Sequence, residues 1–270
     1  MSAAPTGPDA FLAAWPGVAL VEVREAKGST PREEGAWMLV SPEAMFGTIG
    51  GGQLEFMAID RARAMIAAGV PARDVLDVPL GPQIGQCCGG WVVVDIALAD
   101  EEMRAAVRRR AESEEELRPA VYIFGGGHVG HALAAALSLL PLAVTVVETR
   151  ADMLDGLPEA VEARLTAVPE EAVRGAPAGA AFLVLTHDHA LDFLIVAEAL
   201  ARGDAAYVGM IGSKTKRATF ASWYLKEAGG DAASLPRLVC PIGGADVKDK
   251  RPAVIAALAA AEVMRALSGA

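Results

Sequence analysis

The sequence predicts an α/β protein, with an N-terminal α+β domain followed by a Rossmann-like domain that has a doubly wound parallel sheet. Three observations support this class. After residue 119, short β-rich segments alternate with helix-like segments, which is the pattern of parallel βαβ units. A glycine motif of the form G-x-G-x-x-G directly follows the first of these strands. A densely charged stretch at 100–118 separates this half from a first half of different composition.

Length and charge limit the functional classes. The chain has 270 residues, which is enough for two domains that each bury a core. Its 24 basic and 34 acidic residues give a net charge of -10. We therefore expect no binding to nucleic acid, because sequence-independent binding needs a basic surface to neutralise phosphates.

The predicted compartment is the cytoplasm. Three cysteines cannot all pair within one chain, so free thiols in a reducing compartment are the simpler interpretation. Residues 1–17 carry no Lys or Arg ahead of their apolar part, unlike a secretory signal. The longest apolar region, 120–147, is interrupted by "GGGHVGH", so we expect no membrane span there.

The first half is expected to form strands and one amphipathic helix. Strand-like segments lie at 18–29, 36–43 and 91–99. The segment 47–69 combines a glycine loop with a helix that ends at Gly69. The apolar residues of this helix recur at helical spacing and form the stripe Leu54, Ala58, Ile59, Ala62 and Met65.

The charged stretch is predicted to be a solvated helix and linker, because it offers little apolar face. We place the N-terminal domain at 1–105, the helix and linker at 106–118, and the C-terminal domain at 119–270. In the C-terminal domain we expect strands at 120–125, 143–148, 180–186 and 206–212, and helices at 128–140, 190–203 and 214–229.

The glycine motif of the second half consists of Gly125, Gly127 and Gly130, between a strand and a helix. Such glycines permit a tight turn and close backbone approach, so that the helix N-terminus can hold a pyrophosphate. Glu148 ends the next strand, 18 residues beyond Gly130, where an acid suits a ribose hydroxyl. Because the same cradle accepts any phosphorylated ligand, the motif predicts a Rossmann domain rather than a particular cofactor.

The segment "LTHDHALD" lies where a strand ends and a helix begins, which is where open α/β sheets bind ligands. Its residues His187 and Asp188 are candidate ligand contacts. Metal ligation or proton exchange is open to His187 and His189 together with Asp188 and Asp192. In the competing interpretation Asp188 or Asp192 caps the helix and the histidines make loop hydrogen bonds.

The segment "GMIGSKTKRATF" carries Lys214, Lys216 and Arg217 in the first turn of a helix. Cations at a helix N-terminus oppose the helix dipole. A bound anion explains this placement in an acidic protein, and a solvated basic turn explains it equally well.

The first half contains two candidate ligand-binding features, a glycine loop and a pair of adjacent cysteines. The loop "GTIGGGQLE" contains Gly50, Gly51 and Gly52 ahead of a helix, and three consecutive glycines leave the backbone open to close approach. A glycine-rich hairpin end is the competing interpretation. The segment "IGQCCGGWVVV" places Cys87 beside Cys88, and adjacent cysteines do not form an ordinary disulfide with each other.

Taken together, the motifs resemble those of the XdhC/CoxI family, whose members are accessory proteins for molybdenum hydroxylases. The resemblance extends over nearly the whole chain, and seven motifs occur in the family order. They are "GSTPR", "GTIGGGQLE", "GQCCGG", "YIFGGGHVG", "THDHALD", "YVGMIGSKTKR" and "CPIGG".

The resemblance implies an XdhC/CoxI-type domain followed by a Rossmann-like domain. It also implies that the protein is a chaperone rather than an enzyme. Its task would be to bind and protect the molybdenum cofactor and to deliver it into apo xanthine dehydrogenase. The implied partners are the xanthine dehydrogenase large subunit and a cysteine desulfurase that sulfurates the cofactor beforehand. A homodimer is expected on the same basis.

The family pattern gives the two cysteines a role. A soft thiolate suits molybdenum, and the triplet that begins at Cys88 matches the family motif. We therefore expect Cys88 to contact the cofactor and to be a possible molybdenum ligand, with Cys87 second. A small buried hydrophobic residue is the alternative role for either thiol.

The match is least regular after "CPIGG", where the charged turn "ADVKDKRP" stands in place of the family's glycine-containing turn. Two other functions remain open. The glycine motif and Glu148 would also suit an NAD(P)-dependent oxidoreductase, with His187 or His189 as acid or base. That scheme gives no task to the motifs of the first half. A protein-protein adaptor fits clustered glycines at loop mouths less well.

Overall fold

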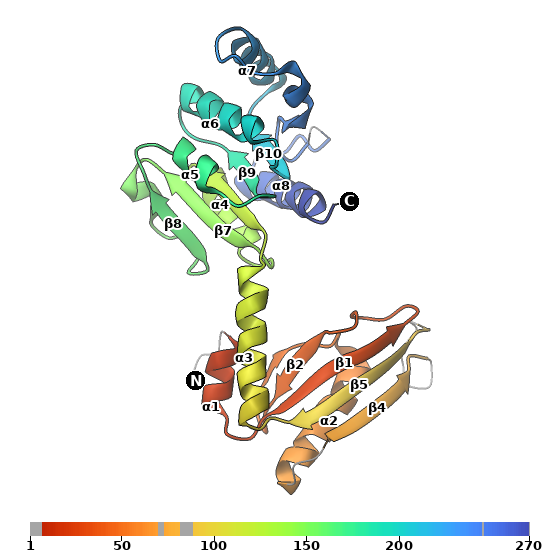
Figure 1. Cartoon of the computed structure of the whole chain (residues 1–270). Coiled ribbons are helices and arrows are strands. Elements are labelled where there is room, and N and C mark those ends of the chain that lie inside the picture. Colours follow the sequence, from red (N-terminus) through yellow and green to blue (C-terminus); the bar gives the residue numbers. More distant parts are fainter. Residues whose placement is uncertain (1–6, 70–72, 82–88, 245, 270) are drawn as a thin grey trace. The chain divides into compact units, whose positions relative to one another are not determined.

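The computed structural model describes residues 7–69, 73–81, 89–244 and 246–269 (Figure 1). The chain divides into two compact units, Met1–Glu116 and Leu117–Ala270.

The first unit is built on an antiparallel sheet. Within its described residues the sheet has the strand order β3-β2-β1-β5-β4. The long strands β1 and β5 pair along almost their whole length, with a register shift between Val23 and Glu25. The strands are β1 (Ala19–Lys27), β2 (Trp37–Val40), β3 (Met45–Gly47), β4 (Arg73–Pro79) and β5 (Trp91–Leu98).

Helix α2 (Gly52–Ala68) covers one face of this sheet. It buries the five apolar residues that the helical spacing predicts, against Val21, Met38 and Val94 among others. Gly69 ends the helix in the left-handed conformation, which favours glycine because it has no Cβ. The sequence therefore predicted this helix and its buried face correctly.

The opposite face is covered by α1 (Pro8–Ala14) and α3 (Glu101–Glu116). Alternate residues of the strands point to this side, so that Leu39 packs with Phe11 and Val107. The charged stretch thus forms a helix with a narrow buried side, and it belongs to the first unit as far as Glu116.

Arg104 makes the main polar connection between α3 and the N-terminal segment. Its side chain is buried and donates hydrogen bonds to the carbonyl oxygens of Leu12 (2.8 Å), Trp15 (3.0 Å) and Pro16 (2.6 Å). One guanidinium therefore satisfies the carbonyls that the end of α1 and the following turn leave without a helical partner.

The second unit contains a parallel sheet, as predicted. Over the described residues its strand order is β11-β10-β9-β6-β7-β8. Read from β8, this is the Rossmann order 3-2-1-4-5-6. The order in which the strands are added reverses between β6 and β9. The strands are β6 (Ala120–Phe124), β7 (Ala143–Glu148), β8 (Val161–Leu165), β9 (Ala181–Val184), β10 (Tyr207–Met210) and β11 (Leu238–Val239).

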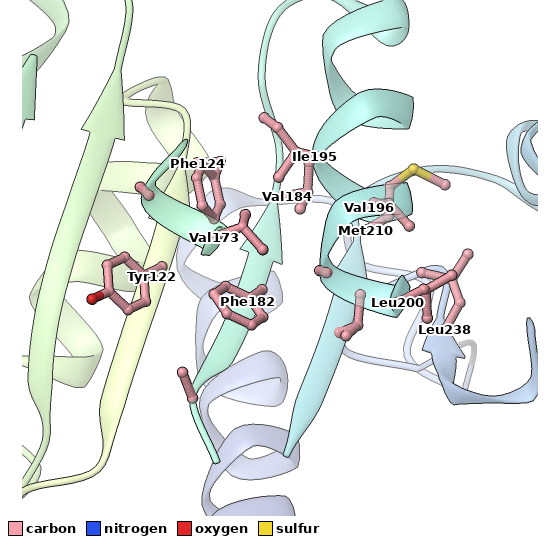
Figure 2. Packing of buried hydrophobic residues seen from close by; sticks show 14 of the residues in the cluster. Tyr122, Phe124, Val173, Phe182, Val184, Ile195, Val196, Leu200, Met210 and Leu238 are labelled. Atoms are coloured by element: carbon pink, nitrogen blue, oxygen red, sulfur yellow. The ribbon is translucent and has the colours of Figure 1, made fainter. Parts of the chain in front are cut away.

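Helices lie on both faces of this sheet. Helices α4 (His128–Leu137) and α8 (Pro252–Leu267) pack together on one face, over residues such as Ile123 and Leu183. Helices α5 (Glu170–Gly175), α6 (His189–Arg202) and α7 (Lys214–Lys226) cover the other. Figure 2 shows this second core, where Ile195 and Val196 of α6 lie near Val184 and Met210 of the strands.

Four of the strands were not expected from the sequence: β3, β4, β8 and β11. Among the helices of the described residues, none combines the length and the apolar character that crossing a membrane requires.

The contacts of Arg104 lead to a prediction for stability. Arg104→Met keeps much of the side-chain volume but leaves three carbonyl groups without their charged donor. Hydrogen bonds to charged groups contribute about 1.5 to 3 kcal/mol each, so we expect the free energy of unfolding to fall by at least about 2 kcal/mol. Urea unfolding followed by tryptophan fluorescence measures this, since Trp15, Trp37 and Trp91 lie in the first unit.

Arg109→Met is the matched control, because Arg109 is exposed on the same helix. It should change the free energy of unfolding by less than about 0.5 kcal/mol. Equal losses in the two variants would contradict the anchoring role of Arg104.

Candidate carboxyl-edge ligand site

The candidate site lies at the carboxyl ends of the parallel strands of the second unit, between β6 and β9, where the order in which the strands are added reverses. Gly125 follows β6 and donates its N–H to the Val147 carbonyl oxygen of β7 at 2.9 Å. Leu185 follows β9 and donates its N–H to the Phe124 carbonyl oxygen at 2.9 Å. Open α/β sheets bind ligands in the crevice at this reversal.

The three motif glycines have different surroundings. A Cβ added at Gly125 would lie 2.5 Å from the Leu185 carbonyl oxygen, and one added at Gly130 would lie 2.0 Å from the Gly125 carbonyl oxygen. These two glycines allow β6, β9 and α4 to pack closely. A Cβ added at Gly127 would meet nothing within 4 Å. Gly127 is therefore the position where backbone at the start of α4 is open to a ligand.

Glu148 lies at the end of β7 and is buried. Its carboxylate accepts hydrogen bonds from the N–H groups of Gly126 (2.9 Å) and Thr149 (2.8 Å), and it forms an ion pair with Arg150 (3.3 Å). Burial raises the pKa of this carboxyl group, but the hydrogen bonds from Arg150, Gly126 and Thr149 outweigh it and lower the pKa to about 2. Glu148 is thus an ionised group that holds the glycine loop in place.

The short 3₁₀ helix η2 (Ala151–Leu154) lies over the same loop. A Cβ at Gly126 would come within 2.2 Å of the Met153 carbonyl oxygen, so this glycine permits the contact. The same oxygen lies 3.0 Å from His131 Nε2. The side of the loop that faces Glu148 is therefore covered by the chain itself.

Asp192 is fully buried in the first turn of α6. One carboxylate oxygen accepts hydrogen bonds from the backbone N–H (2.9 Å) and the hydroxyl group (2.7 Å) of Thr186. The other forms an ion pair with Lys216, whose side chain is also largely buried. This pair connects the loop after β9 to the first turn of α7.

The other polar residues of the loop after β9 are exposed. Asp188 is the N-cap of α6 and accepts a hydrogen bond from the Ala190 N–H at 2.8 Å. This is the capping role that the sequence left open. His187 and His189 are exposed beside it. Across the described residues, no group of three or more His, Cys, Asp or Glu side chains is arranged to hold a metal ion.

The basic turn divides into buried and exposed charges. Lys216 is committed to Asp192, whereas Lys214 and Arg217 are exposed and have no ion-pair or hydrogen-bond partner for their side chains among the described residues. Ser213 caps the helix by accepting the Lys216 N–H. Cys240 lies behind this turn, and burial raises the pKa of its thiol, which disfavours the thiolate form.

The glycine loop of the first unit is also held by a carboxylate. Glu55 of α2 accepts the N–H groups of Ile49 (3.0 Å) and Gly51 (3.1 Å) and the hydroxyl group of Thr48. Gly50, Gly51 and Gly52 all have a positive φ, which explains the run of glycines. Two of the loop's donors are thus in use within the chain. Cys87 and Cys88 lie outside the described residues.

Comparison with known proteins gives two matches to family models. Residues 121–263 match the model described as the XdhC Rossmann domain, and residues 12–78 match the XdhC and CoxI family. The first match alone spans more than half of the chain.

Two individual proteins are similar to this chain. The protein YqeB of Escherichia coli (strain K12) is 25% identical over 263 residues, which cover 92% of this chain and 43% of YqeB. The chain therefore spans less than half the length of that relative. A structure described as a xanthine dehydrogenase from Bacillus halodurans superimposes with a TM-score of 0.78 over 96% of this chain and 94% of that one. At 17% identity this likeness shows the fold alone.

The lowered pKa of Glu148 predicts a pH-dependent stability. The carboxylate stabilises the fold fully above its ordinary pKa of 4.5, and this contribution is lost as the pH falls towards 2. The substitution Glu148→Gln removes this charge and should lower the free energy of unfolding at pH 7 by about 2 to 3 kcal/mol. The difference between parent and variant should shrink steadily between about pH 4.5 and pH 2.

Urea unfolding at a series of pH values, followed by circular dichroism, tests this expectation. Glu159→Gln is the control, because Glu159 is an exposed carboxylate in the same unit. A Glu148→Gln effect that does not vary with pH would show that the charge of Glu148 contributes nothing.

Proposed function

This chain belongs to the XdhC and CoxI family, and from that membership we propose that it binds the molybdenum cofactor and delivers it into apo xanthine dehydrogenase. In this proposal the cofactor is cargo rather than a resident group. The large subunit of xanthine dehydrogenase receives it, after a cysteine desulfurase has sulfurated it. The protein acts as an accessory protein and catalyses no reaction on the cofactor.

The observation that carries the proposal is the open backbone at Gly127. Gly127 lies at the start of α4, at the point between β6 and β9 where the strand order reverses. A Cβ added there would meet nothing within 4 Å. The cofactor carries a phosphate, and amide groups at a helix N-terminus bind phosphate. The neighbouring glycines Gly125 and Gly130 fix this backbone by close packing, so the cradle is formed before a ligand arrives.

The basic turn supports an anionic ligand at the same edge of the sheet. Lys214 and Arg217 oppose the dipole of α7 and have no partner for their charges among the described residues. An anion nearby would compensate both charges, so we assign these two residues to the cofactor as well. His187 and Asp188 follow β9, which is the neighbour of β10 in the sheet. We assign these two polar side chains to the same site.

The thiol of Cys88 is assigned to the metal end of the cargo, with Cys87 as the second choice. This assignment rests on the family motif and on the preference of molybdenum for soft sulfur ligands. Gly50, Gly51 and Gly52 belong to the same unit of the chain. Their positive φ values and the position of Gly51, where an added Cβ meets nothing within 4 Å, favour close approach by a ligand or a partner protein.

An NAD(P)-dependent oxidoreductase fits the same glycine motif less well. In that function Glu148 would bind a ribose hydroxyl. Its carboxylate instead accepts hydrogen bonds from Gly126, Thr149 and Arg150, and the Met153 carbonyl group covers the adjacent backbone. A dinucleotide would have to displace these contacts, at a cost that a phosphate at Gly127 avoids.

Gly127→Val tests the proposed function. The backbone at Gly127 is extended, with φ at -74°, so valine is compatible with the fold while its side chain fills the approach to α4. We expect molybdenum cofactor binding to fall by at least about tenfold, measured by equilibrium dialysis under anaerobic conditions. The circular dichroism spectrum should not change.

Gly175→Val is the control, because an added Cβ at Gly175 also meets nothing within 4 Å and this residue ends α5, away from the glycine motif. It should bind the cofactor as the parent does. Binding of NADH is measured in parallel. A parent protein that binds NADH and no molybdenum cofactor would overturn the proposal in favour of the oxidoreductase.

Cys88→Ala tests the thiol assignment separately. We expect less molybdenum to be retained by protein purified anaerobically from a cofactor-producing host, measured by elemental analysis at equal folded yield. Cys87→Ala is the matched comparison and should retain more. Equal retention in both variants and the parent would remove the thiols from the site, and a larger loss in Cys87→Ala would reverse the assignment.

A further inference from the structure

A cavity separate from the glycine motif lies at the carboxyl ends of β10 and β11. It has a volume of about 490 Å³, within the range of pockets that hold small organic ligands. Much of its wall is apolar and comes from the ends of two strands and the start of α8. These apolar side chains are Ile211, Pro241, Ile242, Val247 and Ile255.

The wall of this pocket is fixed by contacts from behind. Glu262 of α8 accepts hydrogen bonds from the Gly243 N–H (2.9 Å) and the Tyr207 hydroxyl group (2.8 Å). The first bond holds the loop after β11 against α8, and the second connects α8 to β10. Gly209 leaves room for Ile242, because a Cβ there would lie 2.7 Å from the Ile242 side chain. The pocket is therefore formed by the packing of the unit itself.

The charged turn that departs from the family pattern forms the rim of this pocket. Lys248 and Lys250 are exposed on it, and neither has an ion-pair or hydrogen-bond partner among the described residues. The carboxylate of Asp249 is taken up by Arg251, with an ion pair at 2.5 Å. Asp246 is exposed on the same turn but does not line the pocket. The rim thus carries two positive charges without an ion-pair partner among the described residues, in a protein whose net charge is -10.

We propose that this pocket binds a flat heteroaromatic ring that carries a phosphate, with the ring against the isoleucines and the phosphate at Lys248 and Lys250. Two ammonium groups match a phosphate monoester, which carries close to two negative charges at pH 7, better than they match a carboxylate. Gly212 and Gly244 also line the pocket, and neither adds a side chain that would narrow it.

Two sources share this chemistry, a purine nucleotide and the pterin part of the molybdenum cofactor. Only the second rests on the proposed function. Isothermal titration calorimetry on the full chain with AMP, adenosine, inorganic phosphate and isolated molybdenum cofactor distinguishes them. We expect AMP or the cofactor to bind at least about tenfold more tightly than adenosine or phosphate alone.

The decisive variant is Lys248→Gln with Lys250→Gln, which should weaken binding of that ligand by about tenfold or more. Val247→Glu should weaken it too, because Val247 is exposed on the pocket and the new carboxylate repels a phosphate. The control, Lys226→Gln with Arg265→Gln, removes the same charge from exposed positions elsewhere in the unit and should change affinity by less than about twofold.

If the lysine variant loses only AMP binding, the pocket is a nucleotide site that does not bind the molybdenum cofactor. If the variant loses cofactor binding, the pocket is a site for the cofactor. Unchanged binding of both ligands overturns the inference, as does a parent protein that binds neither. If cofactor binding is lost in Gly127→Val and unchanged in the lysine variant, and AMP does not bind, the inference fails while the proposed function stands.

Discussion

The buried carboxylate of Asp192 determines the form of the candidate site. It holds Thr186 through two hydrogen bonds and Lys216 through an ion pair, and it is fully excluded from solvent. A buried charge is tolerated only when it is paired, so the loop after β9 and the first turn of α7 have to come together. This contact turns Lys216 inward and leaves Lys214 and Arg217 outside. The exposed positive charge at this edge is a consequence of one internal pair.

Carboxylates also shape the glycine loops of both units. Glu148 accepts the Gly126 N–H in the second unit, and Glu55 accepts the N–H groups of Ile49 and Gly51 in the first. In each loop an internal anion takes up donors that a phosphate would otherwise use. Gly127 is different, because the space beyond its backbone is open. A Rossmann motif can thus keep its strand–turn–helix geometry while the usual ribose-binding acid becomes part of the loop's own structure.

The sequence predicts those elements whose apolar residues repeat at a regular period or form a continuous buried run. The stripe of α2 and the parallel strands around Gly125 are examples. It does not predict β4, because apolar and polar residue types do not alternate in RDVLDVP, although the burial of β4 does alternate in the structure. Nor does it predict β8, where the types alternate in VEARL over five residues only and the burial does not follow them. In the site, the sequence marks Lys216 as one cation of three and cannot show that it is buried. The spacing of α6 does indicate the partner of Lys216, because Asp192 lies on the same helical stripe as the apolar Ile195 and Val196. A carboxylate on a buried stripe needs a buried counter-charge.

We propose that the carboxyl edge of the second unit receives the molybdenum cofactor. Hydrogen–deuterium exchange of the full chain, with and without isolated cofactor under anaerobic conditions, tests it most directly. If the cofactor binds at this edge, the backbone amides at 126–131 and 212–217 should exchange more slowly in its presence. Binding that leaves both segments unchanged, while it protects amides only in the first unit, would contradict it.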